Sequence, residues 1–297
     1  MLILGIALPV FAGPFRGMFG GRGARGQSDD GEGRANRAPI TLPAGARLEA
    51  NVAYGSDPQQ KFDVYVPANA KNAPVLFMVH GGAWRIGDKT SNRVVQNKID
   101  HYLPKGYVFI STNYRMNDRM TPLAEADDVA AAVAYAQQHA ASWGGDPSRF
   151  VLMGHSAGAH LVTLLSAVPQ IDQRAGVKPW LGTVALDSAA YNVVKIMDQR
   201  HLGFYDDVFG SNRQLWEAAS PTLQLKAAPP PMLLVCSSLR ANSCDQATAF
   251  ADKAKGFGGH VDVLPVAMRH AEINIEAGAP GQLTDRIDAF LRSLGLN

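Results

Sequence analysis

One stretch of the chain, Phe150–His160, constrains the possible fold more than any other part. It starts as an apolar run and then breaks at Ser156, with Gly154 two residues before it and Gly158 two residues after it. A Gly-x-Ser-x-Gly pattern is typical of a sharp turn from a strand into a helix, in which the serine is exposed and a Cβ on either glycine would clash. The Ala- and Leu-rich residues 157–165 suit that helix. We therefore predict that Ser156 is a nucleophile, the alternative being a surface serine in a glycine-rich turn.

Further apolar runs indicate the architecture around this turn. Residues 61–67 alternate between polar and apolar types, as in an antiparallel strand. Continuous apolar runs, typical of strands buried on both faces, occupy residues 73–80, 107–111, 182–187 and 231–236. Helical patterns separate most of these runs, so we predict an α/β fold with a mainly parallel sheet and helices on both faces. No repeat or second domain is apparent, and residues 40–297 are expected to form a single domain.

The N-terminal region differs in composition from the rest. Residues 2–12 are apolar and uncharged and resemble the core of a signal peptide, although the usual basic start is missing. Residues 13–39 are rich in Gly and Arg and are predicted to be a disordered linker. These patterns predict a signal peptide over residues 1–12 and a secreted or periplasmic protein, or a cytoplasmic one if the apolar start is not a signal.

Charge and cysteine content narrow the environment and the partners. The formal net charge is +2, with several of the arginines near the N-terminus, which argues against a nucleic-acid surface on the folded part. No stretch is long enough to cross a membrane as a helix, so no stable membrane insertion is expected. Cys236 and Cys244 are the two cysteines. They are expected to be free thiols in the cytosol, or to form a disulfide if the leader is real.

Polar and glycine-rich chemistry follows four of the predicted strands. The sites are His80-Gly81-Gly82, Ser156, Asp187 and His270. Functional groups of open parallel sheets gather beyond the carboxyl ends of the strands, so we expect these four sites to lie together. This coincidence is the strongest functional signal in the sequence.

A serine nucleophile needs a base, and the position of His270 predicts that role for it. The chain has eight histidines, but His270 alone lies just after a late buried strand and before the last helix. From there it could reach a serine on a central strand. Acyl transfer also needs N–H donors for the developing oxyanion, and the backbone of Ala157, Gly82 and Ala83 is predicted to provide them.

Together these motifs resemble those of the α/β-hydrolase superfamily, specifically its hormone-sensitive-lipase-like carboxylesterases and related acyl-ester hydrolases. The resemblance covers residues 62–294 and rests on five segments: His80–Trp84, Asn113–Arg115, Gly144–Arg149, Gly154–His160 and His270–Asn274. It implies the α/β-hydrolase fold with Ser156 as nucleophile, His270 as base, and Gly81, Gly82 and Ala157 in the oxyanion-hole region.

The acid that orients the histidine is not where the resemblance places it. The family carries an Asp or Glu a few residues after the strand at 232–236, yet residues 237–243 contain no carboxylate. Asp187, at the end of the preceding predicted strand, is our first choice. Asp245 is second: it lies near the start of a predicted helix, where an acidic residue stabilises the helix and needs no catalytic role to explain it. Asn242 is third, since asparagine orients the histidine in some related triads.

The aromatic segment 191–221 is expected to be irregular and to overhang Ser156 as a small cap, or to pack onto the sheet. The predicted pocket contains the aromatic residues Trp84, Tyr114, Tyr191, Phe204 and Tyr205. No cluster has metal-ligand spacing, so neither a metal nor an organic cofactor is expected. The predicted function is hydrolysis of small-molecule or polymer esters through an acyl-enzyme, with an amide, formamide or peptide hydrolase, or an inactive binding protein, as alternatives.

Overall fold

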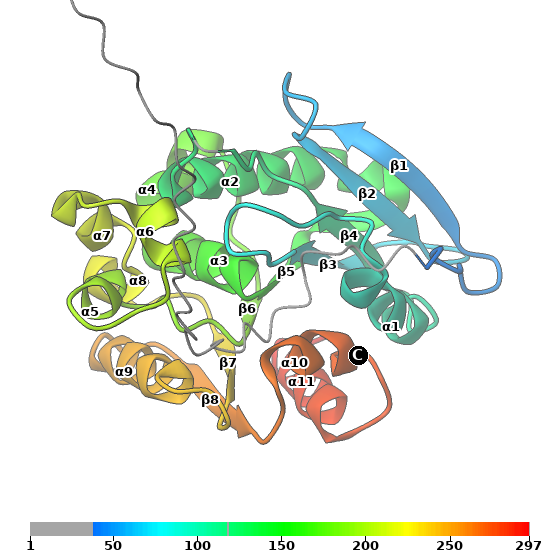
Figure 1. The fold of residues 1–297 in the computed structure, drawn as a ribbon. Coiled ribbons are helices and arrows are strands. Elements are labelled where there is room, and N and C mark those ends of the chain that lie inside the picture. The colour runs from blue at the N-terminus through cyan, green and yellow to red at the C-terminus, as the bar shows by residue number, and fades with distance from the viewer. Residues whose placement is uncertain (1–37, 118, 297) are drawn as a thin grey trace, which may run out of the picture.

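The computed structural model describes residues 38–117 and 119–296, which form a sheet covered by helices (Figure 1). Eight strands follow the order β1-β2-β4-β3-β5-β6-β7-β8. β1 and β2 pair in antiparallel fashion, as do β2 and β4, while every pairing from β4 to β8 is parallel. The predicted mainly parallel sheet is therefore confirmed. The strands are β1 Arg47–Ala53, β2 Lys61–Val66, β3 Ala73–Val79, β4 Val108–Thr112, β5 Gly145–His155, β6 Gly182–Leu186, β7 Met232–Ser237 and β8 Val261–Val266.

Alternate side chains of the central strands enter separate apolar layers, because successive residues of a strand point to opposite faces. Phe77 of β3 packs in the layer that contains α2 and α3, whereas its neighbours Leu76 and Met78 pack in the layer that contains α1 and α11. A third cluster joins β6 and β7 to α9. The expected helices on both faces are thus present. Their bounds are α1 Asn92–Tyr102, α2 Pro122–His139, α3 Ala157–Ala167, α4 Pro169–Ala175, α9 Ser243–Gly256, α10 His270–Glu276 and α11 Gln282–Ser293.

Four short helices occupy the segment that was expected to be irregular, and that expectation was wrong. Asn192 and Asn212 explain two of them, since their side chains accept hydrogen bonds from the first turns of α5 and α7. Figure 1 shows this group of helices clustered beside α3. The group follows the carboxyl end of β6, and two residues of its α6, Phe204 and Tyr205, line the same pocket as Ser156. The helices are α5 Val193–Met197, α6 Phe204–Phe209, α7 Arg213–Ala218 and α8 Pro221–Gln224.

The N-terminal predictions fall on residues that the structure does not describe, apart from residues 38 and 39. The signal peptide at 1–12 and nearly all of the linker at 13–39 thus lie outside the described part. Within residues 38–117 and 119–296, none of the helices has the length and apolar character to cross a membrane.

Candidate active site

The turn at Ser156 has the strained geometry that the glycine pattern predicts. Ser156 joins β5 to α3 with φ of 55° and ψ of −116°, in a region that residues with a Cβ rarely adopt. A Cβ added at Gly154 would overlap the backbone of Gly158, and one at Gly158 would overlap the carbonyl of Val79. The two glycines therefore permit the close crossing of strand and helix that leaves the Ser156 side chain partly exposed.

His270 meets this serine from the other side of the site. It is the first residue of α10, a helix that the sequence did not predict, and its Nε2 lies 2.8 Å from Ser156 Oγ. Its Nδ1 lies 2.6 Å from Oδ2 of Asp187. If Nδ1–H donates to Asp187, Nε2 is left to accept the serine proton. Burial and the neighbouring His155 and Arg240 lower the pKa of His270, although Asp187 acts in the opposite direction. The lowered pKa favours the neutral imidazole, which is the form that can accept a proton.

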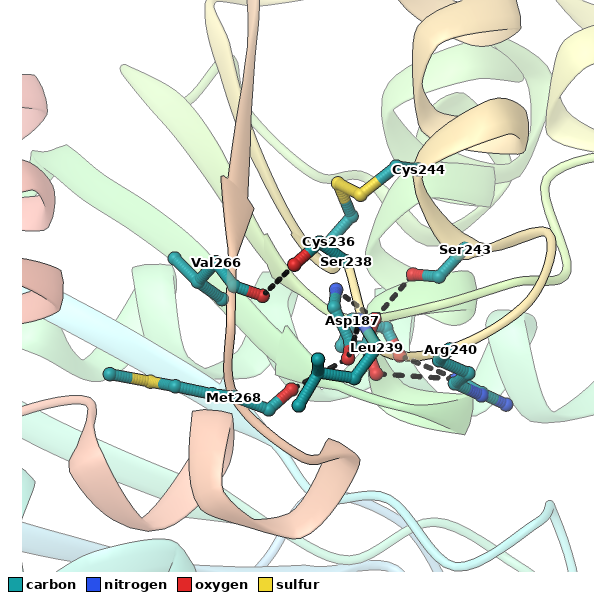
Figure 2. Close-up of a disulfide and its surroundings, with 10 residues drawn as sticks. Asp187, Cys236, Ser238, Leu239, Arg240, Ser243, Cys244, Val266 and Met268 are labelled. Carbon is teal, nitrogen blue, oxygen red and sulfur yellow. Dashed lines mark hydrogen bonds and ion pairs between the residues drawn. A yellow bond between two sulfur atoms is a disulfide. The ribbon is translucent and has the colours of Figure 1, made fainter.

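Asp187 is fully buried and directly follows β6. Its Oδ1 accepts hydrogen bonds from the Ser237 backbone N–H at 2.8 Å and from the Ser243 hydroxyl. Arg240 lies 3.4 Å from its Oδ2, and Figure 2 shows Ser243 and Arg240 beside Asp187. Burial alone would raise the pKa of Asp187, but the interactions with His270, Arg240 and Ser243 outweigh it and lower the pKa well below its usual range. Asp187 therefore remains ionised.

The other two acid candidates do not reach the histidine. Asp245 is exposed in the first turn of α9, where a carboxylate complements the helix dipole. Asn242 is exposed and adopts a left-handed conformation just before that helix. Neither forms a hydrogen bond with His270, so among the three candidates the structure brings only Asp187 to the base.

A disulfide joins the two ends of the loop that contacts Asp187. Cys236 in β7 pairs with Cys244 in α9, and their Cα atoms are 5.1 Å apart. The bridge lies next to the Ser237–Ser243 loop in Figure 2. The disulfide considered from the sequence is thus present, and it closes the segment that supplies both serine donors to Asp187.

The glycine loop after β3 forms a tight turn at the edge of the site. Gly82 has a φ of 120°, and a Cβ there would overlap the Ile86 carbonyl. Ala83 and Trp84 also have positive φ values of 50° and 58°. Gly82 and Ala83 line the pocket in front of Ser156. Gly81, predicted to belong to the same region, is buried and does not line the pocket; its carbonyl is 2.6 Å from Nδ1 of His80.

Ala157, predicted to be an oxyanion donor, is buried and is not among the residues that line the pocket at Ser156. It is the first residue of α3, and backbone N–H groups in the first turn of a helix have no partner within the helix. Its N–H directly follows the nucleophile, as in the turn that the sequence predicts.

His160 fixes the glycine loop, a role that sequence reasoning missed. Trp84 Nε1 donates to His160 Nδ1 at 3.2 Å, and His160 Nε2 lies 2.7 Å from the Ala219 carbonyl, to which it donates. Burial lowers the pKa of His160 to about 4, so this side chain is neutral and can accept and donate at once. The imidazole thereby links the loop, α3 and the segment between α7 and α8. The signal available in the sequence was the position of His160, one helical turn after Ser156.

The aromatic pocket agrees with the prediction in part. Trp84, Phe204 and Tyr205 line the pocket at Ser156. Tyr114 and Tyr191 do not: both are fully buried, Tyr114 stacked on His80 at 4.9 Å between ring centroids and Tyr191 packed 5.8 Å from Phe250. Their rings complete the hydrophobic core, which is why they are unavailable to a substrate. Ile86, Ala189 and Arg240 line the pocket without having been predicted. Among the described residues, no group of three or more His, Cys, Asp or Glu could hold a metal.

Comparisons with curated proteins find esterases. Isoprenylcysteine alpha-carbonyl methylesterase ICME of Arabidopsis thaliana is 26% identical over 274 residues, covering 83% of this chain and 62% of that protein. Esterase LipQ of Mycobacterium tuberculosis is 30% identical over 179 residues, covering 57% of this chain and 42% of that protein. The chain thus spans about half the length of the curated relatives it matches.

Solved structures and family models agree with this architecture. Esterase B from Lactobacillus rhamnosis superposes with a TM-score of 0.71 at 20% identity, covering 86% of this chain and 87% of that one. A truncated carbohydrate esterase from gut microbiota superposes with a TM-score of 0.72 at 17% identity, covering 87% of this chain and 100% of that one. These likenesses show the α/β-hydrolase fold. The BD-FAE family model matches residues 62–239, more than half of the chain. The chain therefore belongs to the BD-FAE family and has the α/β-hydrolase fold.

Proposed function

We propose that this protein hydrolyses carboxylic esters with Ser156, His270 and Asp187 as its catalytic triad. The observation that carries the proposal is the unbroken hydrogen-bonded series from Ser156 Oγ to His270 Nε2, at 2.8 Å, and from His270 Nδ1 to Asp187 Oδ2, at 2.6 Å. A serine hydroxyl next to a neutral imidazole that is oriented by a buried carboxylate is an activated nucleophile. The esterase names of the relatives support an ester as the substrate.

Each residue has one task in the reaction. Ser156 Oγ attacks the ester carbonyl as His270 Nε2 takes its proton, and Asp187 stabilises the imidazolium that forms. The negative oxygen of the tetrahedral intermediate accepts hydrogen bonds from the N–H of Ala157 and from the loop at Gly82 and Ala83. His270 then gives the proton to the departing alcohol. Water, activated by the same imidazole, cleaves the acyl-enzyme and restores Ser156.

We also propose that residues 40–297 form one catalytic domain that works in an oxidising compartment, secreted or periplasmic. The disulfide between Cys236 and Cys244 supports this, since such bonds persist mainly outside the reducing cytosol. Fractionation of the producing cells, followed by alkylation of free thiols, tests the proposal. Recovery of the chain in the cytosol with both thiols free would contradict it.

The test of the esterase proposal is Ser156→Ala. This variant should lose turnover of 4-nitrophenyl acetate by a factor of about 10⁶, because the nucleophile is gone, while circular dichroism and unfolding remain those of the parent. A fluorophosphonate probe should label the parent and leave the variant unlabelled, since labelling requires an activated serine. Full activity in Ser156→Ala, or no labelling of the parent, would overturn the mechanism.

A further inference from the structure

A second cleft opens directly beside the catalytic pocket. The two share three lining residues: Ala189, Tyr205 and Arg240. Beyond them the second cleft is lined from α5 and the turn that follows it, with Lys195 and Arg200, and from the start of α9, with Asn242 and Gln246. Because the shared residues border both spaces, the cleft is adjacent to the pocket at Ser156.

We propose that this cleft binds a carboxylate on the leaving group of the ester, so that the preferred substrates are acidic esters. The inference rests on the proposed esterase function and adds to it a class of substrate. In this reading Lys195, Arg200 and Arg240 are specificity-determining residues: they bind the anion but take no part in bond breaking.

The charges around the cleft favour an anion. No carboxylate is among its lining residues. Two acidic side chains of the cap have partners of their own: Asp198 pairs with Arg213 at 2.9 Å, and Asp206 lies 3.0 Å from Nε2 of His201. Lys195 has no such partner among the described residues.

Arg200 resembles Lys195 in this respect. Both side chains are exposed at the cleft, and Arg200 also lacks an ion pair with any residue in the described part of the chain. A cleft with cations on its rim and no carboxylate in its lining attracts anionic ligands.

Arg240 indicates which part of the substrate enters the cleft. Its Nη1 lies 3.4 Å from Asp187 Oδ2 and 3.2 Å from His270 Nδ1, so the guanidinium is next to the base. Its other nitrogens form no hydrogen bond with a described residue, and about a third of the side chain (31%) is exposed. His270 protonates the departing oxygen, whereas the oxyanion loop at Gly82 and Ala83 borders only the catalytic pocket. The cleft therefore lies near His270 and away from the oxyanion loop, and a leaving group that departs toward His270 would extend into it.

The chemistry of the lining suits a carboxylate in particular. A guanidinium binds a carboxylate through two parallel N–H donors, and an ammonium adds a point charge. Gln246 Oε1 accepts from the Asn192 N–H at 2.6 Å, which orients the amide so that its NH₂ group is available as a further donor.

Matched esters test the proposal. The probes are 4-acetoxybenzoate, with the carboxylate on the leaving group, its neutral methyl ester, and mono-4-nitrophenyl succinate, with the carboxylate on the acyl group. For the parent we expect KM for 4-acetoxybenzoate to be about tenfold below that of the methyl ester. The advantage should shrink at high salt, because exposed charges are screened. The succinate should show no comparable advantage over its own methyl ester.

Charge reversal gives the decisive comparison. In Lys195→Glu with Arg200→Glu, KM for 4-acetoxybenzoate should rise at least tenfold relative to the methyl ester, with little change in the kcat ratio, since binding of ground state and transition state is lost alike. Lys178→Glu is the matched control: Lys178 is exposed and precedes β6, at the opposite edge of the sheet. Lys178→Glu should leave KM for both esters as in the parent. An unchanged ratio in the double variant, or a preference for the succinate instead, would overturn the proposal.

Binding separates this inference from the esterase proposal. Ser156→Ala should bind 4-acetoxybenzoate in calorimetry at least tenfold more tightly than the methyl ester, and the charge reversals should remove that difference. Binding without turnover of any ester by the parent would refute the esterase proposal alone. Turnover of the methyl ester together with equal binding of both probes would refute the anionic cleft alone.

Discussion

The loops that follow β6 and β7 lie side by side but contribute to the surroundings of His270 in opposite ways. The loop after β6 supplies the carboxylate, Asp187, whereas the loop after β7 contains no acidic residue and supplies donors to that carboxylate. Because β6 and β7 pair in parallel, with Leu186 opposite Val235, the ends of the two strands are neighbours. An acid can therefore move from one strand to the next and still reach His270. The requirement is a position next to the histidine, not a position in the sequence.

The largest effect is expected when the carboxylate of Asp187 is replaced by an amide. Asp187→Asn should lower kcat by about 10³- to 10⁴-fold, because an amide neither stabilises the imidazolium nor holds the correct tautomer. Asp245→Asn is the matched control and should change kcat by less than about twofold, since its side chain is exposed on α9. Steady-state kinetics on 4-nitrophenyl acetate decides. A large loss in Asp245→Asn with little effect at Asp187 would return the acid to the segment after β7.

The next effect concerns the stability of the loop after β7. The double variant Cys236→Ala with Cys244→Ala opens a bridge between residues eight positions apart. Loop-closure entropy predicts that the free energy of unfolding falls by about 2.5 kcal/mol. Urea unfolding of parent and variant measures the change, with reduction of the parent by dithiothreitol as a second route to it. Equal stabilities would show that the bridge does not restrain this loop.

A smaller effect should follow loss of a single donor to the acid. Ser243→Ala removes the hydroxyl that donates to the ionised Asp187 in a buried site, so kcat should fall about tenfold, in line with about 1.5 kcal/mol, the lower end for a hydrogen bond to a charged group. Ser243→Thr keeps the hydroxyl and should recover most of the activity. The control is Ser238→Ala, whose exposed side chain donates to the Val266 carbonyl instead. Equal activity of Ser243→Ala and parent would show that the donor is not needed.

The smallest expected effect is a shift in pH dependence. Burial, His155 and Arg240 lower the pKa of His270, and the base works when neutral, so the parent should keep its activity below the usual histidine pKa. Arg240→Met removes one of the lowering charges, so the acid limb of kcat/KM for a neutral ester should move to higher pH. Arg213→Met, at an exposed ion pair of the cap, should leave the limb in place. An acid limb that stays unchanged in Arg240→Met would show that Arg240 does not lower the pKa of His270.

The predictable parts of the site were those with strong local signals. The serine turn was evident because two glycines are needed where strand and helix cross closely, and His270 because it follows a late strand. Tyr114 and Tyr191 were placed wrongly in the pocket, since an aromatic side chain suits a core and a pocket equally well in the sequence. The helices α1 and α10 were not predicted. The N-terminal signal and linker remain predictions, as does the compartment.

The sequence alone determined the class of fold and indicated the residues of the proposed site: buried runs require a parallel sheet, and such a sheet brings the polar ends of its strands to one edge. Tertiary structure decided which of the candidate acids reaches His270. Asp187 and Asp245 each had a local reason for their position, and the choice depends on the pairing of β6 with β7 and on the direction in which α9 begins. Tertiary structure also created the cationic cleft, because Arg240 follows β7 and meets Lys195 and Arg200, which lie in and just after α5, only in the folded chain.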